Sequence, residues 1–286
     1  MSIDIVRQPK ARAQLGESPV WDPETGAIWW IDIDQPRLFC RDAQGNIESW
    51  TLPETPGFVV LLGSAQPVLG METGLFSFDP KTLGFERIVA LDTSGLRFND
   101  ATVDWRGRLW ASTMTLDAQP GHGAIHLVAS DRTLQTIVEG LTIPNGLAID
   151  EAGKRMFYSD SHRDSQMIKT RALSDNGTPG DQDTAFANTR DLDGRPDGAG
   201  MDVEGRYWIA GVDGGAFYVF LKDGQLDEVI PLPFPSPTKL AFTGATGVSM
   251  AITSKSVGDD GGYLTLATPP GGFPGGIVQP YWDPSQ

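Results

Sequence analysis

Residues 16–22 are Gly-Glu-Ser-Pro-Val-Trp-Asp, in which a polar residue stands five positions before an aspartate. The same spacing returns in Asn-Asp-Ala-Thr-Val-Asp at 99–104, Asn-Gly-Leu-Ala-Ile-Asp at 145–150 and Asp-Gly-Ala-Gly-Met-Asp at 197–202. A glycine follows each aspartate within four positions, and an aromatic or aliphatic run comes next. Repetition of this kind indicates a fold built from similar units.

Each copy has two polar positions, which we name by their order. The leading residues are Glu17, Asn99, Asn145 and Asp197, and the trailing aspartates are Asp22, Asp104, Asp150 and Asp202. Successive leading residues lie 82, 46 and 52 positions apart, so we expect a degenerate copy within the first gap, at residues 57–78. A further copy without the polar leading residue is expected near Thr238.

The local pattern between these positions is that of strands and hairpins. Short runs rich in Val, Ile, Phe, Trp and Tyr alternate with Asp-Gly, Asn-Gly and Gly-Gly pairs. Six units of about 40 to 50 residues with about four strands each predict an all-β fold, a six-bladed β-propeller with four-stranded blades around a central channel. We expect residues 1–286 to form one such domain.

The leading residues are expected to converge, because the inner strand of every blade lies along the channel. Two carboxylates and two carboxamides offer oxygen ligands, which suit Ca²⁺, Mg²⁺ or Mn²⁺, and carboxylates also bind Zn²⁺ and Fe²⁺. Alternatively, these four side chains cap strand ends and hydrogen-bond one another across the channel. For the trailing aspartates we expect a local role, in which each carboxylate holds the backbone of its own hairpin.

Composition and charge exclude several classes of partner. The formal charge is −15 and no basic run is present, so we expect neither nucleic acid nor a membrane surface as a partner. There is no apolar run of the about 18 residues that a membrane helix needs, no secretory signal pattern, and Cys40 is the single cysteine. These features indicate a cytoplasmic protein, and we expect a monomer or a weak dimer.

Aromatic and imidazole side chains are interpreted as structural. Trp29, Trp30, Trp110 and Trp208 fall in strand runs and are expected to pack between blades. Trp282, near the C-terminus, is expected either to be exposed or to pack on the last blade. The three histidines, at 122, 126 and 162, show no spacing typical of zinc ligands and are expected on the surface or in packing roles.

Several motifs together resemble one protein family, the senescence marker protein, gluconolactonase and luciferin-regenerating enzyme family, which includes regucalcin. They are Leu-Gly-Glu-Ser-Pro-Val-Trp at 15–21, Arg-Phe-Asn-Asp at 97–100, Gly-Arg-Leu-Trp-Ala-Ser-Thr-Met at 107–114, Pro-Asn-Gly-Leu-Ala at 144–148 and Pro-Asp-Gly at 196–198. The resemblance extends from about residue 15 to Gly-Gly-Ile-Val at 275–278. It implies a six-bladed propeller that binds one divalent cation in its channel and, in many members, hydrolyses sugar lactones.

The resemblance also implies roles for individual residues. It makes Glu17, Asn145 and Asp197 the protein ligands of the cation, with Asn99 beside them in contact with substrate or a bound water. Arg97 corresponds to an arginine that binds the sugar, and Asp117 stands where animal members have a substrate-contacting glutamate, one methylene longer. The segment 237–243 departs from the family, which usually has a small residue or cysteine near Lys239.

Chemistry supports a lactonase. Hydrolysis of a cyclic ester needs a polarised carbonyl, a deprotonated water and a protonated leaving group, and a cation with open positions meets the first need. Asp197 is the candidate general base, or it serves only as a ligand while a metal-bound hydroxide attacks. Two other classes stay open: a calcium-binding regulatory propeller without turnover, and a promiscuous esterase or phosphotriesterase that uses the same cation site.

Overall fold

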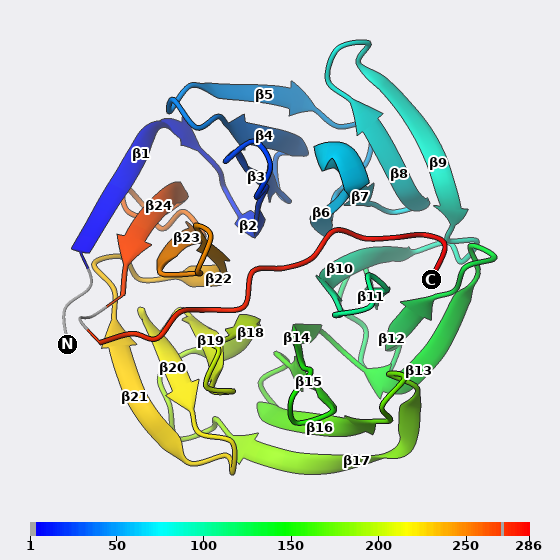
Figure 1. Cartoon of the computed structure of the whole chain (residues 1–286), viewed down its shortest axis with the longest axis vertical. Helices are drawn as coiled ribbons and strands as arrows, with labels where there is room; N and C mark the ends of the chain where they lie inside the picture. The colour runs from blue at the N-terminus through cyan, green and yellow to red at the C-terminus, as the bar shows by residue number, and fades with distance from the viewer. Residues whose placement is uncertain (1–3, 270–271) are drawn as a thin grey trace.

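The computed structural model describes residues 4–269 and 272–286, which form six four-stranded antiparallel sheets arranged as blades in a ring (Figure 1). The predicted six-bladed propeller is therefore confirmed. Three blades come from the first half of the chain: β2 (Gly16–Trp21), β3 (Ile28–Asp32), β4 (Arg37–Arg41) and β5 (Ile47–Thr51) in blade 1; β6 (Phe58–Leu62), β7 (Gln66–Gly70), β8 (Gly74–Asp79) and β9 (Gly84–Ala90) in blade 2; β10 (Leu96–Val103), β11 (Leu109–Thr115), β12 (Gly123–Val128) and β13 (Leu134–Leu141) in blade 3.

The second half supplies the other three blades, and the first strand of the chain completes the last of them. Blade 4 contains β14 (Pro144–Asp150), β15 (Arg155–Asp160), β16 (Met167–Leu173) and β17 (Pro179–Asn188); blade 5 contains β18 (Arg195–Met201), β19 (Tyr207–Val212), β20 (Ala216–Phe220) and β21 (Leu226–Pro231); blade 6 contains β22 (Pro237–Thr243), β23 (Ser249–Ser254), β24 (Tyr263–Thr268) and β1 (Asp4–Arg12). Because β1 pairs with β24, backbone hydrogen bonds close the ring.

Helical structure is nearly absent from the described ranges. The short 3₁₀ helix η1 (Gly63–Ala65) links β6 to β7. No helix within residues 4–269 and 272–286 is long and apolar enough to cross a membrane.

The core is divided among six clusters of buried apolar side chains, one at each interface between neighbouring blades. Strand β3 illustrates why the strand sequences contain consecutive apolar residues. Trp29 and Ile31 pack towards blade 2, whereas Ile28 and Trp30 pack towards blade 6, because successive side chains of a strand point to opposite faces. The expectation that the strand tryptophans pack between blades is confirmed.

The trailing aspartates are buried and hold their own hairpins, as predicted. Asp104 accepts hydrogen bonds from the backbone N–H groups of Arg106 and Arg108 and from the Trp110 indole, at 2.9, 3.1 and 3.0 Å. Asp202 repeats this arrangement in blade 5 with Glu204, Arg206 and Trp208. The repeated aspartate therefore fixes the turn that joins the first two strands of a blade.

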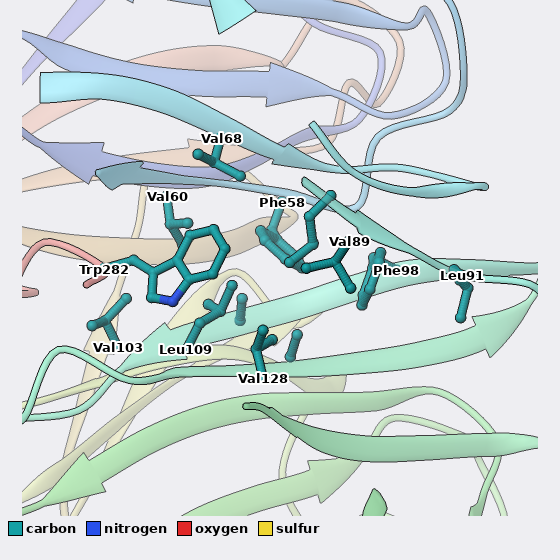
Figure 2. Packing of buried hydrophobic residues seen from close by; sticks show 13 residues of the cluster. Phe58, Val60, Val68, Val89, Leu91, Phe98, Val103, Leu109, Val128 and Trp282 are labelled. Carbon is teal, nitrogen blue, oxygen red and sulfur yellow. The ribbon is translucent and has the colours of Figure 1, made fainter. Parts of the chain in front are cut away.

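The C-terminal segment 275–283 runs across the ring and touches five blades (Figure 1). Its contacts are Ile277 N–H to Met201 O, Gly276 N–H to Gly247 O, the Tyr281 hydroxyl to Asp22, Trp282 N–H to Leu61 O and Asp283 N–H to Gly107 O. Both alternatives for Trp282 were wrong, since its ring is buried between blades 2 and 3, against Val60, Val103 and Leu109 (Figure 2). No repeat pattern marks this position, so its neighbours could not be read from the sequence.

Candidate functional site

A cavity of about 190 Å³ at one end of the channel contains all four leading residues. Blades 1, 3, 4 and 5 each contribute three lining residues at equivalent positions of the repeat. The leading residues Glu17, Asn99, Asn145 and Asp197 form one set; the residues two positions earlier, Leu15, Arg97, Ile143 and Arg195, form a second; and residues at the end of the second strand, Ile33, Met114, Ser161 and Val212, form the third.

The inner strands bring the leading residues to the channel through irregular pairing at the same place in each copy. The register with the second strand shifts between Glu17 and Val20, Phe98 and Ala101, Asn145 and Ala148, and Pro196 and Ala199. Strand β6 of blade 2, the degenerate copy, pairs regularly and contributes no residue to the cavity. A bulge of this kind re-aims side chains, so the repeated motif encodes the bulge together with the polar group that it presents.

The backbone at Gly146 illustrates the local requirement. Its φ of +66° is a conformation that favours glycine, and an added Cβ would lie 2.5 Å from the Tyr207 hydroxyl. That hydroxyl donates to Gly146 O at 2.7 Å. Glycine after Asn145 is therefore needed for the path of the chain beside the cavity.

The three predicted cation ligands leave oxygen atoms available. Asn145 donates its Nδ2–H to Ser161 Oγ at 3.0 Å, which turns its Oδ1 away from that partner. Glu17 Oε2 accepts the Ser18 backbone N–H at 2.8 Å, which leaves Oε1 free of that bond. Asp197 is buried at 8% exposure, and it lines the same cavity. This donor set of two carboxylates and an amide oxygen fits a divalent cation with oxygen preference.

The carboxylates are held in an environment that disfavours their charge. The pKa of Glu17 is raised to about 7, chiefly by burial; the charge of Lys239 opposes this rise and the charge of Asp100 adds to it. Burial, Glu17 and Asp100 together raise the pKa of Asp197 well above its usual value. Excess negative charge in a buried cavity is the condition that a bound cation relieves.

Within the described residues, no group of three or more His, Cys, Asp and Glu side chains is arranged to hold a metal ion. The proposed set contains two such side chains, Glu17 and Asp197, and its third member is the amide of Asn145. None of the three histidines lines the cavity. His126 is buried in blade 3 between the hydroxyls of Thr113 and Thr136, which agrees with the packing role expected for it.

Asn99 and Arg97 form one unit at the cavity wall. Arg97 Nη1 donates to Asn99 Oδ1 and to Phe98 O, both at 2.8 Å, and Asn99 Nδ2 donates to Pro144 O at 3.0 Å. Both polar ends of the Asn99 amide are thus engaged, which sets it apart from Asn145. Burial lowers the pKa of Arg97, although Glu17 opposes this effect.

Asp117 lies outside the cavity lining. It is exposed in the turn after β11, where its Oδ2 accepts a hydrogen bond from Gln119 Nε2 at 2.8 Å, and this bond lowers its pKa. Met114 on the same strand reaches the cavity. The structure therefore brings together five of the six predicted site residues and leaves Asp117 on the surface turn.

Two features of the site escaped the sequence reasoning. Arg195 and Ser161 line the cavity, and the repeat register identifies them: Arg195 stands two positions before its leading residue, as Arg97 does, and Ser161 directly follows the second strand of its blade. The other feature is an ion pair between Lys239 Nζ and Asp100 Oδ1 at 2.5 Å. Asp100 was read only as part of a motif and Lys239 only as a departure from the family.

Comparison with known proteins agrees with the propeller fold and places the chain beside related proteins. A model of the SMP-30/Gluconolactonase/LRE-like region matches residues 15–256. The 6-deoxy-6-sulfogluconolactonase of Pseudomonas putida is 32% identical over 87% of this chain and 85% of its own, and the L-arabinolactonase of Azospirillum brasilense is 26% identical over 90% and 89%. A solved structure of a calcium-binding protein, regucalcin, from Agrobacterium tumefaciens superposes with a TM-score of 0.89 at 24% identity, over 99% of this chain and 98% of that chain.

Proposed function

The chain belongs to the SMP-30/Gluconolactonase/LRE-like family, and from this premise we propose that it is a lactonase that opens a sugar lactone to the aldonic acid with the help of one divalent cation. The names of two relatives support the reaction class, since one is a sulfogluconolactonase and the other an arabinolactonase. The single observation that carries the proposal is the convergence of Glu17, Asn145 and Asp197 on one cavity beside a partly buried arginine, Arg97.

The proposed cation is held by Glu17, Asn145 and Asp197. When bound, it supplies positive charge that polarises the lactone carbonyl and opposes the negative charge that develops on its oxygen. Calcium, zinc, magnesium, manganese and iron(II) all accept carboxylate oxygens, so the identity of the ion is a matter for measurement.

Asp197 is proposed as the general base. Without a cation, burial beside Glu17 disfavours its charged form. With a bound cation the carboxylate is held ionised, so that it is available to accept a proton. In this role it accepts the proton of the attacking water and returns a proton to the ring oxygen when the ester bond breaks. The alternative, in which Asp197 is a ligand only, predicts activity that no longer depends on its basicity.

Arg97, Asn99 and Asp117 are proposed to bind the sugar. Asn99 holds one nitrogen of Arg97, and this fixes the guanidinium at the cavity wall, where its other N–H groups face hydroxyl or ring oxygens of a substrate. Asp117, on the exposed turn at this end of blade 3, is proposed to contact the outer part of the sugar. The apolar part of the wall consists of Leu15, Ile33, Met114, Ile143 and Val212, and it limits entry of water.

The competing proposal is a calcium-binding protein without turnover, and the Agrobacterium regucalcin structure is described as that of a calcium-binding protein. Initial rates separate the possibilities. Gluconolactone, xylonolactone, L-arabinolactone and 6-deoxy-6-sulfogluconolactone are assayed beside paraoxon and phenyl acetate, each with several divalent ions and with chelator. We expect cation-dependent hydrolysis of at least one sugar lactone at a rate well above that of the esters. Tight cation binding without hydrolysis of any lactone would contradict the proposal.

A further inference from the structure

The channel contains a second polar feature beyond the proposed cation ligands. Asp100 and Lys239 occupy the same position of the repeat, one residue after the leading position, in blades 3 and 6. These blades stand opposite each other in the ring, with β10 and β22 on either side of the channel (Figure 1). The Lys239 side chain therefore spans the channel to reach its partner.

The charged groups of both residues are hydrogen-bonded to protein atoms. Lys239 is 5% exposed, and its Nζ donates to Asp100 Oδ1 at 2.5 Å and to Ala101 O at 2.9 Å. Asp100 Oδ1 and Oδ2 also accept the backbone N–H groups of Ala101 and Leu147, each at 2.8 Å. Asp100 thus connects blades 3, 4 and 6, and its charge is buried at 4% exposure.

The aliphatic part of the Lys239 side chain passes close to the backbone of Gly198. A Cβ added at Gly198, directly after Asp197, would lie 2.4 Å from Lys239 Cγ. The glycine of Pro-Asp-Gly therefore leaves the space that the lysine occupies beside a proposed ligand. Lys239 also lines a separate cavity of about 60 Å³ at the opposite end of the channel, so the ion pair separates that cavity from the site.

The net charge of the side chains in the channel explains why a lysine lies beside the proposed ligands. The charge of Asp100 acts on both Glu17 and Asp197, Glu17 also acts on Asp197, and Lys239 is the cation that acts on both Glu17 and Asp197. The arginines at the mouth have other partners as well: Arg195 pairs with Asp213 at 3.3 Å, and Arg97 interacts with Asp34 and Glu72 besides Glu17. Three negative charges and one positive charge leave two, which a single divalent ion balances.

We propose that the positive charge of Lys239 determines which ionic charge the channel accepts. With Lys239 in place, the three carboxylates, the lysine and one divalent cation together have no net charge. This inference rests on the cation of the proposed function. Without the lysine, the three carboxylates match a trivalent ion. Without Asp100, the remaining two carboxylates and the lysine match a monovalent ion. The electrostatic interaction between buried charges is strong enough for such selection.

The test removes the two charges of the pair singly and together, and it measures cation binding instead of activity. Dissociation constants for Ca²⁺ and Tb³⁺ are measured by calorimetry, with terbium luminescence as a second readout, in the wild type and in Lys239→Met, Asp100→Asn and the double variant. The matched control is Lys81→Met, which removes an exposed lysine at the turn between β8 and β9. The quantity compared is the ratio of the Ca²⁺ constant to the Tb³⁺ constant.

Removal of the lysine charge is expected to raise this ratio at least about tenfold, and removal of the Asp100 charge to lower it by a similar factor. The double variant restores the net charge and returns the ratio to near that of the wild type, and Lys81→Met leaves it unchanged. If Lys239→Met does not fold, the lowered ratio in Asp100→Asn and its return to the wild-type value in the double variant still test the inference. Calcium binding with the same ratio in all folded variants would overturn this inference alone, whereas a wild type that binds neither ion would overturn the proposed function.

Discussion

At the scale of single residues, Glu17 and Asp197 are carboxylates whose charge the cavity disfavours. Replacement of Asp197 by Ala is expected to lower kcat by about 10³-fold or more, because both a ligand and the proposed base are lost. Steady-state rates at saturating cation measure this effect. A variant that turned over as fast as the wild type would remove Asp197 from the mechanism.

Arg97 is proposed to act on the substrate and not on the cation. Replacement of Arg97 by Ala should raise KM by about tenfold or more while cation binding persists, because a charged hydrogen-bond donor to the sugar is lost. Calorimetric titration of the cation and measurement of KM on the same preparation separate the two effects. Loss of cation binding in this variant would instead make Arg97 part of the cation site.

The raised pKa of Glu17 gives the cation-free protein a defined dependence of stability on pH. Its ordinary value of 4.5 rises to about 7 in the folded state, so between these values the folded protein binds more protons than the unfolded chain does. The free energy of unfolding of the cation-free protein therefore decreases as the pH rises through this window. Cations, which compete with these protons, should bind more weakly as the pH falls below about 7.

Calorimetric Tm values in chelator between about pH 4.5 and 7.5 check this dependence, with Glu17→Gln as the control because glutamine does not titrate. The variant should lose less stability than the wild type as the pH rises across the window. Equal slopes in the two proteins would contradict the role assigned to Glu17.

At the scale of elements, each repeated motif combines an inner-strand bulge with a hairpin fixed by an aspartate. Replacement of Asp104 by Ala is expected to reduce the free energy of unfolding by about 3 to 5 kcal/mol, because Arg108 and Trp110 lose a buried partner. Chemical denaturation measures the loss. Asp131→Ala, at the exposed hairpin between β12 and β13, is the control and should cost less; an equal cost would show that burial of Asp104 contributes little.

Much of this level could be predicted from the sequence. The spacing of the repeats predicted the blades, the hairpin role of the trailing aspartates and the convergence of Glu17, Asn99, Asn145 and Asp197. It could do so because equivalent positions of the repeat lie at equivalent places around the channel. The Lys239–Asp100 pair could not be foreseen. It joins opposite blades through one long side chain, and the last copy has Thr238 where the others have a leading residue.

At the scale of the whole molecule, the two ends of the chain secure the ring. Strand β1 completes blade 6, and the segment 275–283 crosses the channel end opposite the site, where Ile277, Gln279 and Pro280 line the smaller cavity. Neither contact follows the repeat, and both join residues far apart in the chain. This is why the sequence indicated a closed propeller without showing how its ends are placed.

The buried ring of Trp282 tests this closure. Replacement of Trp282 by Ala is expected to cost about 3 to 5 kcal/mol of the free energy of unfolding, since a cavity is left between blades 2 and 3. Val229→Ala, at a strand position with 48% exposure, is the control and should change stability little. Denaturation of both variants gives the comparison, and a small loss for Trp282→Ala would mean that the segment merely rests on the ring.

The central claim is that a divalent cation held in the channel is required for opening of a sugar lactone. Its most direct test is the initial rate of lactone hydrolysis by protein stripped of metal and then titrated with one divalent ion. No enzymatic rate is expected in the stripped protein, and the rate is expected to rise to a plateau at one ion per chain. Full hydrolysis by the stripped protein, unchanged by added ion, would contradict it.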